Sequence, residues 1–377
     1  MTPGRPRRVL ILNWRDLRHP EGGGGERYVE QVARGLVAGG DDVTIHCAAY
    51  PGAARRETIA GVGYRRAGGR LTVYPRGIMA VLRLRPDVVV DVQNGVPFFS
   101  VLVHSRVVRL VHHISRDQWF GAFPRVVARV GWWLESRVVP RLYRAAPAVG
   151  VSSATRDDLV RMGADPRRTA VVYNATEPAP VWPADQRPAP PDPTTLCVVA
   201  RLVPHKQVDH AVEVLARLAS EHPGLRLRVI GDGPAAGELA AHAARLGVAD
   251  RVDLLGFVDE AAKHRAIASS WLLLCPSGKE GWGRVVMEAA VHGVPAIAYR
   301  RAGGLGEAIV DGETGLLADN VEELAAHTRR LLDDPVERDR LGRRAADRAA
   351  EFTEERTVAD FRRALAGAAS PLLRSAR

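Results

Sequence analysis

Two glutamates stand eight positions apart in the segment KEGWGRVVMEA, which runs from Lys279 to Ala289. Glu280 lies among glycines, whereas Glu288 interrupts the apolar run VVMEAAV. The flanking glycines at 281 and 283 allow a sharp turn and a close approach of the backbone to a ligand. A helix that begins near Gly283 or Arg284 would direct its free N–H groups and positive dipole end toward that ligand. Glu288 would then lie about 7.5 Å further along the helix axis.

This spacing suits an elongated ligand that carries negative charge. One carboxylate and several amides would meet one part of the ligand, and the second carboxylate would meet another part. The alternative is that Glu280 is a solvated loop residue and Glu288 belongs to an ordinary helix surface. The apolar residues on both sides of Glu288 count against that alternative.

Two permanent cations lie at a second junction of strand, loop and helix. In VARLVPHKQVDH, Arg201 directly follows an apolar run and Lys206 precedes a helical pattern. The bidentate fork of arginine and the point charge of lysine would together bracket a diphosphate. The alternative is a pair of solvated surface cations.

A glycine-rich loop, EGGGGER, follows the first apolar run and contains Gly22, Gly23, Gly24 and Gly25. It is not a dinucleotide-binding fingerprint, because Arg27 stands where the third glycine would be needed. Nor does an acidic residue close the next strand, TIHCAAYPG, to hold a ribose hydroxyl. A nicotinamide-dependent dehydrogenase is therefore disfavoured. Taken alone, the loop is also compatible with a flexible turn.

The elements that must position these groups repeat the order strand, loop, helix. A strand at Val9–Leu12 leads through the glycine loop to a helix from about Glu26. Apolar residues at helical spacing predict one buried stripe on that helix, namely Tyr28, Val29, Val32, Ala33, Leu36 and Val37. Further strands are expected at 41–49, 85–93, 195–200, 226–234, 251–256, 271–277 and 295–299, and further helices at 207–222 and 235–247. The pattern predicts two doubly wound, Rossmann-like α/β domains, with a ligand in the cleft at the carboxyl ends of the strands.

A proline-rich stretch separates the two domains. Residues 178–193 contain seven prolines, which fix φ and lack a donor N–H, so neither a helix nor a central strand is expected there. We expect an N-terminal domain at 1–177, a linker at 178–193, a C-terminal domain at 194–353 and a helical tail at 354–377. One arrangement of the tail crosses back to the first domain.

Composition indicates a globular protein with two domains, since 377 residues exceed one typical core and 46% of them are hydrophobic. No apolar run reaches the ~18 residues that a membrane span needs. The basic and then apolar start, MTPGRPRRVLILNW, is interpreted as a first buried strand because no small-residue cleavage site follows. Cys47, Cys197 and Cys275 are too widely separated for a disulfide framework or a metal site. A cytoplasmic protein is expected.

The net charge of +10 is unevenly distributed. Residues 1–180 carry 27 Arg and Lys against 15 Asp and Glu, whereas the remainder carries 26 against 28. Either the first half is arginine-rich and solvated, or it meets an anionic partner such as a membrane surface or a phosphorylated acceptor. Nucleic acid is not expected, because no recognised binding motif accompanies the arginines.

One arginine-rich segment combines cations with aromatic and aliphatic residues. Residues 119–145 read WFGAFPRVVARVGWWLESRVVPRLYRA. The stripe comprises Val126, Val127, Val130, Trp133 and Leu134, with Arg125, Arg129 and Arg137 beside it. In one interpretation the segment is a domain helix that buries its stripe; in the other it docks on a membrane or holds a lipid-linked acceptor.

Together these motifs resemble the retaining GT-B glycosyltransferases of family 4, the E-x7-E enzymes. The resemblance rests on Arg201 with Lys206, IGDGP, LLGFV, CPSGKEGWGRVVMEAAVHGVPAIA and GGLGEAIVDGETGLL, in this order. It is strong over about 195–318 and looser over the N-terminal half, where the glycine loop, VHH and VGVSSATRDDLVRMG are similar. The resemblance covers most of the chain.

The resemblance implies roles in donor binding. Arg201 and Lys206 would hold the pyrophosphate and neutralise the leaving group. Glu280 and the amides of the three residues after it would hold donor-sugar hydroxyls, and Glu288 would bind the ribose. Gly231 would leave room for the nucleotide, and the backbone at Phe257 and Val258 would face the base. The implied donor-binding set is Gly231, Phe257, Val258, Gly281, Trp282, Gly283, Arg284 and Glu288.

The resemblance also implies roles for the first domain. Gly22–Gly25 would close over the phosphates or the acceptor. His112 or His113 would approach the donor sugar, and we favour His112. His113, Arg116 and Asp117 are acceptor-side candidates, with a local ion pair as the alternative for the last two. Two departures stand out: Gln207 replaces a glycine usual in the family, and YNATE replaces Asn-Gly-Val.

The expected reaction is retaining transfer of a sugar from a UDP- or GDP-sugar to a hydroxyl acceptor, in cell-envelope glycan, glycolipid or secondary-metabolite synthesis. No Asp-x-Asp metal motif lies near the site, and fixed cations are present, so neither a metal nor a cofactor is expected. Alternatives are a sugar-nucleotide epimerase on the same frame and a non-catalytic protein that binds sugar nucleotides or lipids. The enzyme would be cytoplasmic or peripheral on the inner face of the membrane. Fold and motifs leave the donor base, the sugar and the acceptor open.

Overall fold

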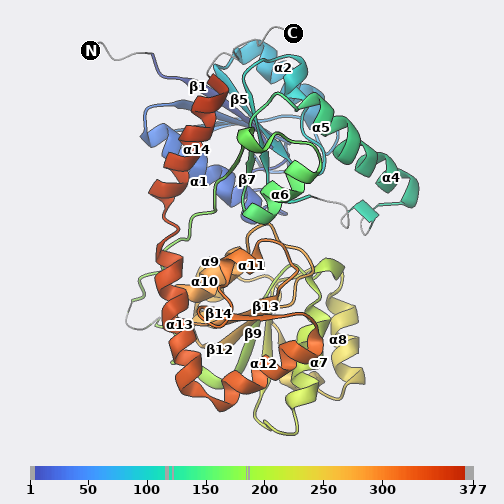
Figure 1. The fold of residues 1–377 in the computed structure, drawn as a ribbon, viewed down its shortest axis with the longest axis vertical. Helices are drawn as coiled ribbons and strands as arrows, with labels where there is room; N and C mark the ends of the chain where they lie inside the picture. Colours follow the sequence, from blue (N-terminus) through green and yellow to red (C-terminus); the bar gives the residue numbers. More distant parts are fainter. Residues whose placement is uncertain (1–4, 115–118, 121–122, 184, 186, 370–377) are drawn as a thin grey trace. The chain divides into compact units, whose positions relative to one another are not determined.

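The structure is a computed structural model that describes residues 5–114, 119–120, 123–183, 185 and 187–369 (Figure 1). Contacts divide the chain into two compact units. The first unit comprises Met1–Ala175 and Thr353–Arg377, and the second comprises Thr176–Phe352. Among the described helices, none is both long enough and apolar enough to cross a membrane.

The first unit contains a sheet in the strand order β3–β4–β2–β1–β5–β6–β7–β8. Its strands are β1 (Arg8–Leu12), β2 (Asp42–Cys47), β3 (Arg56–Ile59), β4 (Val62–Arg66), β5 (Val88–Gln93), β6 (Val107–Val111), β7 (Ala148–Gly150) and β8 (Thr169–Val171). All neighbours are parallel except β3 and β4. The chain leaves β1 toward β2 and returns on the other side to β5. The switch point of the sheet, where ligands bind in such folds, therefore lies between β1 and β5.

Helices cover this sheet, and a helix from the end of the chain joins them. The helices and turns are α1 (Gly24–Ala38), α2 (Val73–Leu84), η1 (Ser100–Leu102), α4 (Arg125–Trp133), the π-helical η2 (Leu134–Val138), α5 (Val139–Leu142), α6 (Ser153–Arg161), η3 (Pro166–Arg168) and α14 (Glu354–Ala369). Figure 1 shows α14, in red, beside α1, in blue. The two helices approach closely at Gly35, where an added Cβ would lie 2.1 Å from a methyl group of Val358.

The second unit has a wholly parallel sheet in the order β11–β10–β9–β12–β13–β14. Its strands are β9 (Asp192–Val199), β10 (Arg226–Ile230), β11 (Val252–Leu254), β12 (Ser270–Cys275), β13 (Ala296–Tyr299) and β14 (Gly315–Ala318). The order reverses between β9 and β12, so the loops that follow these two strands flank the switch point. Those are the loops that carry Lys206 and Glu280.

The helices of the second unit complete the doubly wound arrangement. They are η5 (Pro204–Lys206), α7 (Val208–Leu218), α8 (Ala236–Arg245), η6 (Ala249–Arg251), α9 (Glu260–Ala268), α10 (Arg284–Ala290), α11 (Leu305–Ala308), α12 (Val321–Asp333) and α13 (Pro335–Ala350). Buried aliphatic residues of β9 and α7, among them Leu196, Val212 and Leu215, form part of the core.

Several boundaries differ from those expected. Helix α1 begins at Gly24 rather than near Glu26, so the last two glycines of the loop belong to its first turn. Strand β9 begins at Asp192, inside the stretch expected as linker, and its first residue pairs with Ser270. The boundary between the two units falls at Ala175 and Thr176. The predicted strands of both sheets are present; β1, β9 and β12 begin earlier than expected, and the others are shorter at one or both ends. Strands β3, β4, β6, β7, β8 and β14 were not predicted.

Candidate functional site

The loops after β9 and β12 bring Lys206 and Glu280 together, although 74 positions separate them in the chain. The Lys206 Nζ contacts the Glu280 Oε1, and the Ser277 hydroxyl donates to the same oxygen at 2.9 Å. The backbones also meet, because the Gly278 N–H donates to the His205 carbonyl at 2.9 Å. About a fifth of each charged side chain is exposed. Glu280 is therefore not a freely solvated loop residue. Ser277 was not predicted as a site residue.

A second segment, residues 302–304, holds the backbone of the Glu280 loop by hydrogen bonds. The Glu280 N–H donates to the Ala302 carbonyl at 2.9 Å, and the Gly304 N–H donates to the Glu280 carbonyl at 3.1 Å. A Cβ added at Gly304 would lie 2.2 Å from the Gly281 carbonyl oxygen. A glycine at 304 is therefore needed for this support, which explains part of the motif GGLGEA.

The turn into α10 has the geometry that its glycines predict. Gly283 has a φ of 94°, and a Cβ there would lie 2.4 Å from a Leu305 methyl group. The Trp282 side chain is buried, with its ring edge-on to Phe352 at 4.8 Å. Only the backbone of Trp282 is thus available for the expected contact with a sugar hydroxyl.

Glu288, on α10, is held by two cations. The Lys263 Nζ of α9 lies 2.9 Å from one carboxylate oxygen, and the Arg284 guanidinium lies 3.2 Å from the other. Burial opposes ionisation of Glu288, but the charges of Arg284 and Lys263 outweigh it, so the pKa of Glu288 is lowered. The Glu288 carboxylate is ion-paired and its side chain only 12% exposed, so it is not an ordinary surface residue. Arg284 also approaches Glu177 at 3.9 Å. Lys263 was not predicted.

Two histidines extend this cluster. His264 of α9 and His292, which follows α10, lie with Nδ1 and Nε2 2.9 Å apart. Burial lowers the pKa of His264, and burial together with the charge of His264 lowers the pKa of His292 to about 4. Both rings are therefore neutral near pH 7, when one can donate to the other.

The remaining donor-side candidates lie at the ends of β9, β10 and β11. Arg201 is exposed, and no ion pair joins it to another residue in the part of the chain that the structure describes. Gly231 has a φ of 125°, and a Cβ there would lie 2.0 Å from the Ala200 carbonyl oxygen. The Gly231 N–H donates to the Gly256 carbonyl at 2.8 Å, which places it beside the segment of Phe257 and Val258. Phe257 is exposed.

In the first unit, the glycine loop and His112 meet. A Cβ added to Gly25 would lie 3.2 Å from the His112 ring, so a glycine allows this contact. The His112 Nε2 is buried and has no hydrogen-bond partner among the described residues. Burial, with a contribution from the charge of His113, lowers the pKa of His112 to about 3, so the ring is neutral near pH 7. His112 is the histidine whose ring borders the loop.

The loop itself is fixed at both ends. Gly22 passes close to Leu17, whose carbonyl oxygen would lie 2.6 Å from an added Cβ. Glu26 turns back, and its carboxylate accepts a hydrogen bond from the Gly23 N–H at 2.9 Å. Glu26 was not predicted as a site residue, although a glutamate three residues after a helix cap is a known signal. Arg116 and Asp117 lie outside the described residues.

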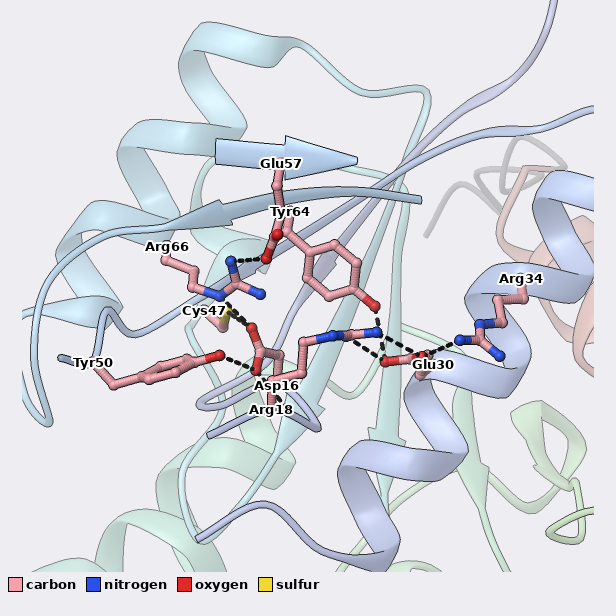
Figure 2. Close-up of polar contacts among 9 residues, drawn as sticks. All are labelled: Asp16, Arg18, Glu30, Arg34, Cys47, Tyr50, Glu57, Tyr64 and Arg66. Atoms are coloured by element: carbon pink, nitrogen blue, oxygen red, sulfur yellow. Dashed lines mark hydrogen bonds and ion pairs between the residues drawn. The ribbon is translucent and has the colours of Figure 1, made fainter. Parts of the chain in front are cut away.

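An unpredicted network of charged side chains anchors the segment before the glycine loop (Figure 2). Asp16 accepts a bond from the Arg66 Nε at 2.5 Å and another from the Arg18 N–H at 2.9 Å. Arg18 in turn pairs with Glu30 of α1 at 2.9 Å, and Glu30 accepts a bond from the Tyr64 hydroxyl at 3.0 Å. We call these residues, with Arg34, Cys47, Tyr50 and Glu57, the anchoring network. It ties the loop to β2, β3, β4 and α1.

Known proteins resemble both halves of the chain. The family described as glycosyl transferases group 1 matches residues 184–348, and the one described as Glycosyltransferase Family 4 matches residues 22–179. Glycogen synthase of Mycobacterium tuberculosis is 32% identical over 248 residues, which are 64% of this chain and 55% of that protein. An exopolysaccharide phosphotransferase of Streptomyces coelicolor is 39% identical over 163 residues, 43% of this chain. This chain spans only 17% of the length of that relative.

Solved structures resemble the chain over nearly its full length. A sucrose-phosphate synthase from Thermosynechococcus elongatus has a TM-score of 0.78 at 20% identity, covering 96% of this chain and 100% of that one. HepE of Anabaena in complex with UDP and glucose has a TM-score of 0.72 at 18% identity, with the same coverage of both chains. At these identities the likeness concerns the fold: two Rossmann-like units of the kind found in GT-B enzymes.

Proposed function

We propose that this chain, which belongs to the GT-B glycosyltransferases of family 4, transfers a sugar from a nucleoside-diphosphate sugar to a hydroxyl acceptor. One observation carries the proposal: a lysine and a glutamate meet at the switch point of the second sheet. Departure of a diphosphate needs positive charge, and a sugar with free hydroxyls needs a hydrogen-bond acceptor. Lys206 and Glu280 supply the two requirements side by side.

In the proposed complex, Lys206 and Arg201 hold the diphosphate. The exposed guanidinium of Arg201 offers a bidentate fork, and Lys206 offers a compact charge. The backbone at Gly281 and Gly283 approaches the sugar, and Glu280 accepts bonds from its hydroxyls. Glu288 binds the ribose hydroxyls. The contact with Lys206 keeps Glu280 in place before the donor arrives, so little reorganisation is needed on binding.

We propose that the donor is a UDP- or GDP-sugar. The complex of HepE with UDP and glucose supports the first choice by similarity of fold. Thermal-shift measurements with UDP-, GDP-, ADP- and dTDP-sugars would identify the base, since a ligand at a hundred times its Kd stabilises by about 2.7 kcal/mol. A protein that none of these nucleotides stabilises would contradict the proposal.

We propose that the transfer retains the anomeric configuration and needs no metal. In this proposal Glu280 binds sugar hydroxyls and Ser277 holds the Glu280 carboxylate, so neither is assigned as a nucleophile. Attack on the same face, assisted by the leaving phosphate, is then the simplest mechanism. Positive charge from Arg201 and Lys206 would replace a divalent ion. We expect activity to survive EDTA. Loss of activity in EDTA and recovery with Mg²⁺ would contradict this, and would direct attention to Asp209, His210 and Glu213, whose ligand atoms lie within 4.8 Å of one another.

The first unit is proposed to bind the acceptor. Its glycine loop and the neutral ring of His112 adjoin each other at the end of β6, close to the switch point of that sheet. A neutral imidazole with an unpartnered nitrogen can exchange hydrogen bonds with a sugar or an acceptor hydroxyl. We further propose that the acceptor is lipid-linked and that the enzyme works at the inner face of a membrane.

Matched variants test the proposed site. Lys206→Ala should abolish the thermal shift caused by the nucleotide diphosphate. Glu280→Gln should keep most of that shift but lower turnover by at least about a hundredfold, the usual effect of removing one group that stabilises a transition state. Glu221→Gln, which breaks an exposed pair with Arg329 at 2.6 Å, is the control and should change neither. Conversion of the nucleotide-sugar with donor alone would indicate an epimerase, whereas release of the nucleoside diphosphate only when an acceptor is added would indicate transfer.

A further inference from the structure

The helical segment α4–η2–α5 presents apolar side chains to solvent. Val126, Val130 and Trp133 are 71%, 53% and 56% exposed. Arg137 and Arg141 continue the same row at steps of four residues, and both are exposed. We call this row of five residues the α4–α5 face. The interpretation that the segment buries its stripe is therefore wrong for these apolar residues.

The opposite side of the segment is firmly seated on the first unit. Ala128, Gly131, Glu135, Val139 and Tyr143 are buried. The Trp119 ring lies against Gly131, where an added Cβ would be 2.5 Å from it, and the Trp119 indole donates to Glu135 at 2.6 Å. Rotating the helix to bury Val126 and Trp133 would expose this side. The exposure of the α4–α5 face is thus a stable property of the fold.

A π-helical turn, Leu134–Val138, joins α4 to α5 and keeps the exposed residues of both helices on one side of the segment. Such a turn is wider than an α-helical turn, so residues four apart remain on one side. Trp133, Arg137 and Arg141 consequently line one open hollow of about 590 Å³ with Val138 and Leu142. The hollow combines an indole, aliphatic groups and two guanidinium groups.

The charge around this face has one sign. Residues 119–145 contain five arginines, at 125, 129, 137, 141 and 144, and a single acidic residue, Glu135. Glu135 is fully buried and holds Trp119 and Gln93. None of the five guanidinium groups forms an ion pair within the described parts of the chain, unlike the arginines of the anchoring network. Their field is therefore not neutralised locally.

We propose that the α4–α5 face is a docking surface for an anionic lipid membrane. Val126, Val130 and Trp133 would enter the boundary between head groups and acyl chains, where tryptophan is favoured. Arg137 and Arg141 would contact lipid phosphates. A second copy of the chain is a poorer partner, because two such faces would bring like charges together. The inference assigns a surface to the membrane location proposed above, and vesicle binding tests it independently of sugar transfer.

Vesicle flotation of the full chain tests the proposal. The wild type should bind vesicles of phosphatidylcholine with phosphatidylglycerol, bind phosphatidylcholine alone weakly, and be released by high salt. Arg137→Gln with Arg141→Gln should lower the partition coefficient about 30-fold, from two contributions of about 1 kcal/mol. Val126→Ser with Val130→Ser should lower it at least about tenfold, because these methyl groups would no longer be buried.

Matched changes elsewhere provide the controls. Arg343→Gln with Arg344→Gln, and Val336→Ser, alter exposed residues of α13 and should leave vesicle binding unchanged. Because all substituted side chains are exposed, the melting temperatures should stay close to that of the wild type. Equal binding to neutral and anionic vesicles, or equal loss in the α13 controls, would overturn the proposal. So would a dimer that dissociates on Trp133→Ser while no vesicle is bound.

Discussion

At the scale of single residues, the few lysines of this arginine-rich chain lie at or next to the candidate site. Only three of the 53 basic residues are lysines: Lys206, Lys263 and Lys279. Lys206 contacts Glu280, Lys263 contacts Glu288, and Lys279 precedes Glu280 in the chain. A compact ammonium and a planar guanidinium are not interchangeable at a crowded site. The rarity of lysine was thus a signal in the sequence that could have identified Lys263.

Replacing Lys263 tests its role as a positioning residue for Glu288. Lys263→Met should raise the KM for the donor about tenfold and leave kcat within about threefold, because a charged hydrogen bond of about 1.5 kcal/mol is lost away from the reacting carbon. Lys263→Arg should restore part of the affinity. Steady-state kinetics with the donor varied would measure both. A fall in kcat at unchanged KM would contradict the assignment, and Arg329→Met serves as the exposed control.

Gln207 shows why the family pattern has a glycine at this position. It adopts a left-handed conformation, with a φ of 48°, between η5 and α7, so the turn is kept although the glycine is absent. Left-handed backbone costs a residue with a side chain about 1 kcal/mol. Gln207→Gly should therefore be neutral or stabilising by up to about 1 kcal/mol in urea unfolding, with activity retained. Gln207→Val should destabilise, since a branched side chain fits this conformation poorly.

At the scale of elements, what the sequence could predict depended on periodicity. Buried strands such as β5 and amphipathic helices such as α1 follow from runs and spacings of apolar residues. The buried side of the segment α4–η2–α5 did not follow from such a pattern. It consists of Ala128, Gly131 and Glu135 rather than of the larger apolar residues of the segment. The room that Gly131 leaves for Trp119 is a contact between distant positions, which no local pattern reveals. The charged pairs of the anchoring network were missed for the same reason.

The anchoring network should contribute strongly to the stability of the first unit. Both side chains of the pair Arg66–Asp16 are only 1% exposed. Asp16→Ala would leave the buried Arg66 with Glu57 as its remaining carboxylate partner in the network (Figure 2). We expect a loss of about 3 kcal/mol, as is typical of breaking a buried pair. Calorimetry would measure it. Asp157→Ala, which breaks an exposed pair with Arg156, should cost less than about 1 kcal/mol.

Across the whole molecule, the burial of ionisable groups predicts a stability maximum near neutral to mildly alkaline pH. Burial lowers the pKa of His46 to about 4, and burial also lowers the pKa of His112 to about 3 and that of His292 to about 4. In the unfolded chain these groups titrate near 6.5. Burial raises the pKa of Cys197 and Cys275 to about 12. The folded state therefore favours neutral histidines and neutral thiols. A positive charge on these histidines or a negative charge on these thiols lowers the free energy of unfolding.

The direction in which stability changes at acidic pH follows from the difference in proton binding between the unfolded and the folded chain. Below pH 6.5 these histidines bind protons in the unfolded chain but stay neutral in the folded chain. Their contribution to the free energy of unfolding is therefore present above pH 6.5 and is lost as the pH falls toward 4. At pH 5 each histidine with a folded pKa of about 4 should reduce the free energy of unfolding by about 2 kcal/mol relative to pH 8. His46→Gln should flatten the fall in melting temperature between pH 7 and pH 5, because one group that charges only on unfolding is removed. His327→Gln, a change at a less buried histidine, is the control; a slope in the His46 variant identical to that of the wild type would contradict the contribution assigned to His46.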